Sequence, residues 1–140
     1  MIMTPFHLAF PVRNLEETRQ FYADVLGCEM GRSSDSWVDF SLFGHQMSAH
    51  LRTQTDTDGG AGKVDGISVP IPHFGVVLLM DDWTKLAERL ESEPSVHWIE
   101  RPMIRFKGEP GEEATLFIRD PSGNALEFKG FRSMEQVFAH

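Results

Sequence analysis

The sequence contains a single cysteine, Cys28, in a chain of 140 residues. One cysteine can form neither an internal disulfide nor a multi-cysteine zinc site. Long apolar runs are also missing, because the longest one, residues 76–80, is far shorter than the roughly 20 residues of a membrane-spanning helix. The N-terminus lacks a basic segment followed by a long apolar stretch, which argues against a secretory signal. These absences predict a cytoplasmic globular protein with one domain over residues 1–140.

Positive charge is scarce. The chain has 13 Lys and Arg residues against 21 Asp and Glu residues, and its net charge is −8. Contacts with phosphate groups need clustered cations, so this balance argues against a nucleic-acid or membrane partner. The densest basic cluster holds Arg101, Arg105 and Lys107, and it suits a small anionic ligand better than a duplex. We therefore expect a small molecule as the binding partner.

Apolar residues that alternate predict strands, and apolar residues with helical spacing predict helices. In the first half they predict a helix opened by Asn14, with Glu17 completing a capping box, and strands at 6–10, 28–32, 36–43 and 46–52. In the second half they predict a helix capped by Asp81 and strands at 73–80, 96–101, 113–119 and 124–129. A short tail helix is predicted over 133–139, with Ser133 as its cap. The order β-α-β-β-β thus occurs twice.

This repeat predicts an α+β fold. The modules cover residues 1–52 and 73–131, and a surface loop over 53–72 joins them. Each module has one apolar sheet face for its helix to cover. We expect the two sheets to form one curved, cup-like mixed sheet with the helices on the outside.

Four polar side chains share the faces that the helices leave open. His7, His50 and His73 each lie on the opposite side of their strand from its apolar residues, and Glu127 does so in the last strand. If the sheets close into a cup, these residues meet on its floor. Three imidazoles and a carboxylate are typical ligands of a divalent first-row metal, which predicts a metal site.

Two segments resemble a known family. They are Pro5-Phe6-His7-Leu8-Ala9 at the start of the chain and, near its end, Asp120-Pro121-Ser122-Gly123-Asn124-Ala125-Leu126-Glu127. With the doubled β-α-β-β-β order, they resemble the vicinal oxygen chelate superfamily of glyoxalase I, extradiol dioxygenases, fosfomycin-resistance enzymes and bleomycin-binding proteins. The likeness covers nearly the whole chain, and the segment near its end is the most specific part.

The resemblance implies three metal ligands, which are His7, His73 and Glu127. Two histidines and one carboxylate leave open positions for a substrate and O2 on Fe2+, the favoured metal, although Ni2+, Co2+, Zn2+ and Mn2+ suit the same donors. His50 takes the place where glyoxalase I has a carboxylate, so it is either a fourth ligand or a catalytic acid/base.

The resemblance implies a homodimeric enzyme similar to the ring-cleaving extradiol dioxygenases. The alternatives are a glyoxalase-like isomerase, which shares the chelation step, and a non-catalytic binding protein of the bleomycin-resistance type. Four residues are predicted to contact the substrate. They are the aromatic residues Trp37 and Phe117 and the cations Arg105 and Lys107, which precede a turn.

Overall fold

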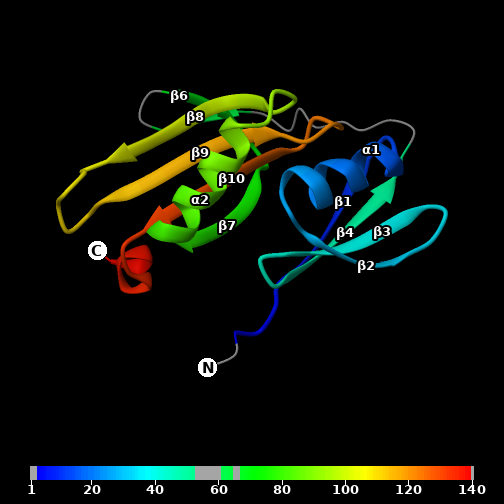
Figure 1. Ribbon diagram of the computed structural model, residues 1–140, viewed down its shortest axis with the longest axis horizontal. Helices are drawn as coiled ribbons and strands as arrows, with labels where there is room; N and C mark the ends of the chain where they lie inside the picture. The colour runs from blue at the N-terminus through cyan, green and yellow to red at the C-terminus, as the bar shows by residue number, and fades with distance from the viewer. Residues whose placement is uncertain (1–2, 53–60, 65–66, 140) are drawn as a thin grey trace. The chain divides into compact units, whose positions relative to one another are not determined.

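The computed structural model describes residues 3–52, 61–64 and 67–139. The chain forms two compact units (Figure 1). Unit 1 is Met1–Asp56 together with Pro121–Asn124, and unit 2 is Thr57–Asp120 together with Ala125–His140. Each unit contains a four-stranded mixed sheet, as the predicted α+β fold of two β-α-β-β-β modules requires.

In unit 1 the sheet has the strand order β1-β4-β3-β2. Its elements are β1 (His7–Val12), α1 (Leu15–Arg19), a π-helical turn (Gln20–Val25), β2 (Glu29–Ser33), β3 (Trp37–Leu42) and β4 (His45–Leu51). The helical segment begins where the Asn14 side chain accepts a hydrogen bond from the Glu17 backbone N–H, and it ends before Gly27, whose φ is 80°. Between helix and sheet, the Phe10 ring contacts the rings of Tyr22 and Phe40 edge to face, and the Tyr22 and Phe40 rings stack on each other.

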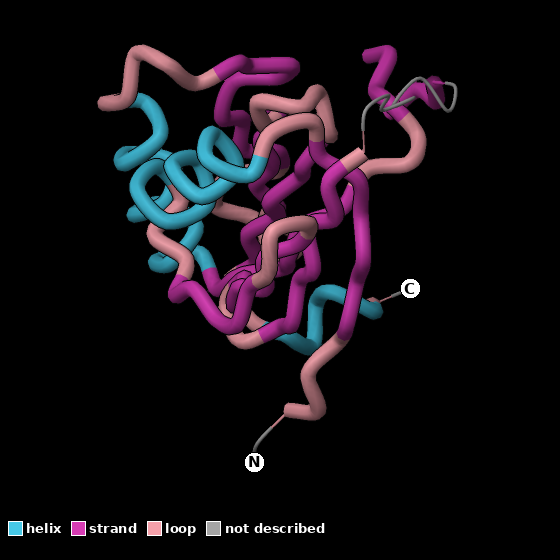
Figure 2. Tube along the Cα trace, turned by 90° about the vertical axis from the view of Figure 1, so that its right-hand side faces the viewer, coloured by secondary structure: helices cyan, strands magenta, loops and turns pink. Residues whose placement is uncertain are grey.

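In unit 2 the sheet has the order β7-β10-β9-β8. Its elements are β7 (Phe74–Leu79), α2 (Met80–Glu91), β8 (His97–Arg105), β9 (Glu113–Arg119), β10 (Ala125–Phe131) and a 3-10 turn (Met134–Phe138). Helix α2 packs on β7, β9 and β10. Figure 2 shows the helices in cyan and the strands in magenta. Trp83 of α2 donates a hydrogen bond to the Phe128 carbonyl at 2.9 Å, and a Cβ at Gly130 would come within 2.8 Å of the Trp83 side chain. Gly130 thus lets the helix approach the sheet closely.

Three local predictions need correction. Helix α2 begins at Met80 with Leu79 as its cap, so Asp81 lies in the first turn, where its charge favours the helix dipole. The stretch 53–72, predicted as a loop, contains the antiparallel pair β5 (Ala61–Val64) and β6 (Ile67–Pro70), while 53–60 and 65–66 lie outside the described residues. Strand β8 runs four residues past the expected end at 101, because it stays paired with β9 up to Glu113.

The turn that carries the most specific family segment belongs to unit 1. Ser122 Oγ accepts a hydrogen bond from the Arg13 backbone N–H, and the Asn124 amide donates one to the Pro11 carbonyl, both at 2.9 Å. Gly123 has a φ of 90°, a conformation that favours glycine. These contacts explain the physical need for a serine, a glycine and an asparagine in this order.

In both units the first strand pairs in parallel with the last strand of the module. His7 is opposite Gln46 in the β1–β4 pair, and Gly75 is opposite Glu127 in the β7–β10 pair. At Gly75 the strands come so close that an added Cβ would overlap the Glu127 carbonyl oxygen. Only glycine therefore fits at this point of β7.

We predict that Gly75→Ala destabilises the protein by about 1–3 kcal/mol, because the new methyl group must push β7 away from β10. Urea unfolding followed by circular dichroism measures the change. Gly31→Ala in β2 is the matched control, since a Cβ there meets its nearest atom, the Asp39 carbonyl oxygen, at an ordinary 3.4 Å. Equal stability of the two variants would contradict the close approach.

The turn between β8 and β9 is anchored by a charged pair. Glu112 is buried, and its carboxylate accepts hydrogen bonds from Arg132 Nε at 2.6 Å, Arg132 Nη2 at 3.2 Å and the Gly108 backbone N–H at 2.9 Å. The bond from Arg132, followed by that from Gly108, lowers the pKa of Glu112 below its ordinary value of 4.5. The folded state therefore favours the charged carboxylate.

We predict that this pair makes the protein acid-sensitive. Because folding lowers the pKa of Glu112, the contribution of this carboxylate to the free energy of unfolding is complete above about pH 4.5. It is lost as the pH falls through the folded-state pKa. Glu112→Gln should be less stable than the wild type at neutral pH, and the difference should shrink in acid. Chemical unfolding over a pH series measures this, with Glu109→Gln in the same turn as control. A difference that stays constant with pH would refute it.

Candidate functional site

A histidine and a carboxylate meet on the open face of the unit 2 sheet. The strand register places Gly75, Glu127 and Phe117 side by side, and His73 immediately precedes β7. His73 Nε2 lies 3.3 Å from Glu127 Oε1, and the two side chains are 25% and 12% exposed. The structure therefore brings together two of the predicted ligands.

The His73 ring is fixed by its other nitrogen. Nδ1 lies 2.7 Å from the Pro70 carbonyl oxygen. A carbonyl can only accept a hydrogen bond, so Nδ1 carries the proton, and in the neutral ring Nε2 is a bare lone pair. Histidines that bind metals typically donate their other ring N–H to such an acceptor.

In the neutral ring two lone pairs therefore face each other, one on His73 Nε2 and one on Glu127 Oε1. Such an arrangement is favourable when a proton or a cation lies between the two atoms. An imidazole nitrogen and a carboxylate oxygen are both good ligands of divalent first-row metals, so these residues fit a metal ion. Within the described part of the chain, no group of three or more His, Cys, Asp or Glu side chains is placed to hold a metal.

Phe117 forms an apolar wall beside this pair. Its ring is 2% exposed and contacts the His73 ring edge to face, with the centroids 5.0 Å apart. An aromatic neighbour holds the imidazole plane and keeps water from that side of it. Phe117 was predicted as a substrate contact, and here it touches a candidate ligand.

In unit 1 His7 has the same arrangement of ring nitrogens. Its Nδ1 lies 2.9 Å from Gln46 Oε1, which can only accept, so Nε2 is again left without a proton in the neutral ring. His7 is exposed, at the start of β1 and opposite Gln46 of β4. Its Nε2 is thus available as a ligand atom.

His50 lies on β4, further along this strand than Gln46. It is opposite Trp37 of β3 and Pro11 of β1, four residues after Gln46. At roughly 3.3 Å per residue this separates its backbone from that of Gln46 by about 13 Å. The register therefore makes Gln46, not His50, the neighbour of His7 on β4, and a fourth-ligand role for His50 stays a prediction. Its role as an acid/base stays a prediction.

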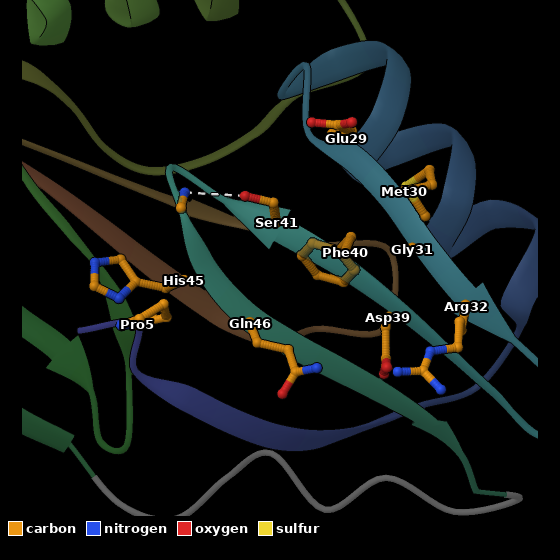
Figure 3. A pocket seen from close by; sticks show the side chains of 11 residues that line it. Pro5, Glu29, Met30, Gly31, Arg32, Asp39, Phe40, Ser41, His45 and Gln46 are labelled. Atoms are coloured by element: carbon orange, nitrogen blue, oxygen red, sulfur yellow. Dashed lines mark hydrogen bonds between the residues drawn. The ribbon is translucent and has the colours of Figure 1, made fainter. Parts of the chain in front are cut away.

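A cavity of about 410 Å³ opens on the same sheet of unit 1 (Figure 3). Its lining includes the ionisable side chains of Glu29, Arg32, Asp39 and His45, together with Gln46. Arg32 and Asp39 lie side by side in Figure 3, and Asp39 Oδ1 accepts a hydrogen bond from Ser48 at 2.5 Å. Because Gln46 both lines the cavity and contacts His7, the cavity adjoins this histidine. Its volume suits a small ligand.

The other predicted substrate contacts lie apart from these groups. Trp37 is half-buried in β3 of unit 1 and is outside the cavity lining. Arg105 lies over the Phe106 ring at 5.0 Å and is opposite Glu113, four residues along β9 from Phe117. Lys107 is exposed in the following turn. Within unit 2, the two cations are therefore not gathered around His73 and Glu127.

Sequence reasoning missed the groups that hold the ligands in place. They are the Pro70 carbonyl, the Gln46 amide and the Thr115 hydroxyl, which donates to Glu127 Oε2 at 2.7 Å. Strand alternation does place Thr115 on the same face as Phe117, and this signal could have indicated it. A backbone carbonyl leaves no such signal.

Comparison with known proteins identifies the family. The model of the Glyoxalase/Bleomycin resistance protein/Dioxygenase superfamily matches residues 4–128, so the chain belongs to this superfamily. It includes enzymes and non-catalytic binding proteins; its members bind small molecules, commonly use divalent metals and often form dimers. No curated protein matches the chain at a significant level. No helix in the described ranges is long and apolar enough to cross a membrane.

Solved structures share the fold. A glyoxalase/bleomycin resistance protein/dioxygenase from Alicyclobacillus acidocaldarius is 29% identical, with a TM-score of 0.78 and 96% of each chain covered. The fosfomycin resistance protein FosX from Mesorhizobium loti is 15% identical, with a TM-score of 0.66 over 99% of this chain and 100% of that one. TioX from Micromonospora sp. ML1 is 13% identical, with a TM-score of 0.64 over 91% and 98%. The last two likenesses concern the fold alone.

Proposed function

We propose that this protein is a metal-dependent enzyme that holds a divalent cation through His73 Nε2 and Glu127 Oε1. The observation that carries the proposal is the 3.3 Å approach of these two atoms while Pro70 keeps the proton on the other ring nitrogen. We assign His7 as the third ligand, because Gln46 leaves its Nε2 bare in the same way and because the family resemblance implies it.

Two histidines and one carboxylate are the ligand set of many Fe2+ oxygenases, so Fe2+ is the proposed metal. When bound, such an ion would lower the pKa of two neighbouring substrate oxygens and supply electrons to O2. The protein supplies the rest. Pro70 and Gln46 orient the two rings, and Phe117 covers one side of His73.

Among the reactions of the superfamily, we propose ring cleavage by dioxygenation. The residue opposite His7 on β4 is Gln46, an amide, whereas the resemblance to glyoxalase I calls for a carboxylate ligand on this strand. A three-ligand set leaves more positions for the two substrate oxygens and O2. His50 is the proposed acid/base that moves protons during the reaction. We also propose that the enzyme is a cytoplasmic homodimer, as the resemblance and the single cysteine suggest.

We predict about one iron or manganese per chain in protein purified without an affinity tag. His73→Ala and Glu127→Gln should each lose most of this metal, since each removes one ligand atom, and a double variant His7→Ala/His73→Ala should lose all of it. Elemental analysis measures the content. His97→Ala, which changes an exposed histidine at the start of β8, is the matched control. Wild-type protein that holds no metal even after reconstitution would refute the enzyme and leave a binding protein.

We predict that the iron-loaded protein consumes O2 with catechols and that His50→Ala slows this turnover by 10²–10⁴-fold. The metal content should stay at the wild-type level, because His50 is not among the proposed ligands. An oxygen electrode measures the rate. Isomerisation of a methylglyoxal–thiol adduct without O2 uptake would instead support the glyoxalase-like reaction. A parallel fall in metal content in His50→Ala would show that this residue is a ligand.

A further inference from the structure

Thr115 contacts the candidate carboxylate ligand from the neighbouring strand. It lies in β9 and is 7% exposed, and its hydroxyl donates a hydrogen bond of 2.7 Å to Glu127 Oε2. The register places it opposite Lys129 of β10 and Met103 of β8. A threonine at this point could equally well be a valine if only packing mattered, because the two side chains have nearly the same shape.

The hydroxyl distinguishes the two carboxylate oxygens. Oε2 accepts the bond from Thr115, and Oε1 faces His73 Nε2 at 3.3 Å. A free carboxylate can rotate and bind a cation with both oxygens, which occupies two coordination positions. With Oε2 held by Thr115, the carboxylate presents a single oxygen toward the histidine.

We propose that Thr115 is a positioning residue that directs Glu127 to bind the cation through Oε1 alone. The inference rests on the proposed metal-dependent function. Its consequence is specific, since one-point binding by Glu127 preserves the open position that a second substrate oxygen needs. Three groups then fix the pair from different strands, because the Pro70 carbonyl holds His73, Thr115 holds Glu127, and Gly75 allows the strands to meet.

The test compares Co2+ binding to the full-length, metal-free protein and its variants. Thr115→Val replaces the hydroxyl with a methyl group, and we expect its Kd for Co2+ to rise by about 10–100-fold, the usual effect of losing a partner of a metal ligand. The visible absorption of bound Co2+ should also change, because Glu127 is free to bind with both oxygens. Thr115→Ser keeps the hydroxyl and should restore both the affinity and the spectrum.

Thr18→Val is the matched control. Thr18 is 1% exposed, and its hydroxyl donates a 2.6 Å hydrogen bond to the Asn14 carbonyl in unit 1, so this variant also loses a buried hydroxyl bond. It should bind Co2+ as the wild type does. Circular dichroism establishes that each variant is folded, and Thr115→Ala replaces Thr115→Val if the latter does not fold.

The outcomes separate the two proposals. A wild type that binds no Co2+ overturns the metal-dependent function and this inference with it. A wild type that binds Co2+ while folded Thr115→Val or Thr115→Ala binds it equally well, with the same spectrum, overturns the role of Thr115 alone. Weakened binding in the hydroxyl-free variants, restored by Thr115→Ser and absent from Thr18→Val, supports it.

Discussion

The parallel pairing of the first and last strands is the constraint on which each unit depends. In unit 2 it places Gly75 opposite Glu127, and the lack of a Cβ at Gly75 lets the two backbones meet there. His73, two residues earlier, then reaches the carboxylate, whose nearest oxygen is 3.3 Å away. In unit 1 the same pairing places His7 opposite Gln46. The pairing that closes each module also assembles its polar face.

The chemistry of this face depends as much on the groups that hold the candidate ligands as on the ligands themselves. A carbonyl oxygen fixes the proton of His73 on Nδ1, and an amide oxygen does the same for His7. A hydroxyl occupies one oxygen of Glu127. Each contact removes an alternative tautomer or orientation before a ligand binds, and such preorganisation reduces the free-energy cost of binding.

Much of this could be predicted from the sequence, because alternation of apolar residues reports which face of a strand a side chain occupies. It indicated the doubled module and the open-face positions of His7, His73 and Glu127. Alternation does not report position along a strand, so His50 could not be told from Gln46 as the neighbour of His7; only the register does this. The β5–β6 pair was missed because glycine and proline lie in these strands, and both residues usually mark loops.

The outer strands of the two sheets have a consequence for solubility. Strands β2 and β8 lie at sheet edges, where unpaired backbone groups can recruit another chain. The register of β2 shifts between Met30 and Ser33, and that of β8 shifts twice between Trp98 and Met103, with Pro102 inside the irregular stretch. A bulged strand with a proline is a poor template for strand addition. At the opposite edges β1 and β7 pair in regular register, so these irregularities protect one edge of each sheet, formed by β2 and β8, against aggregation.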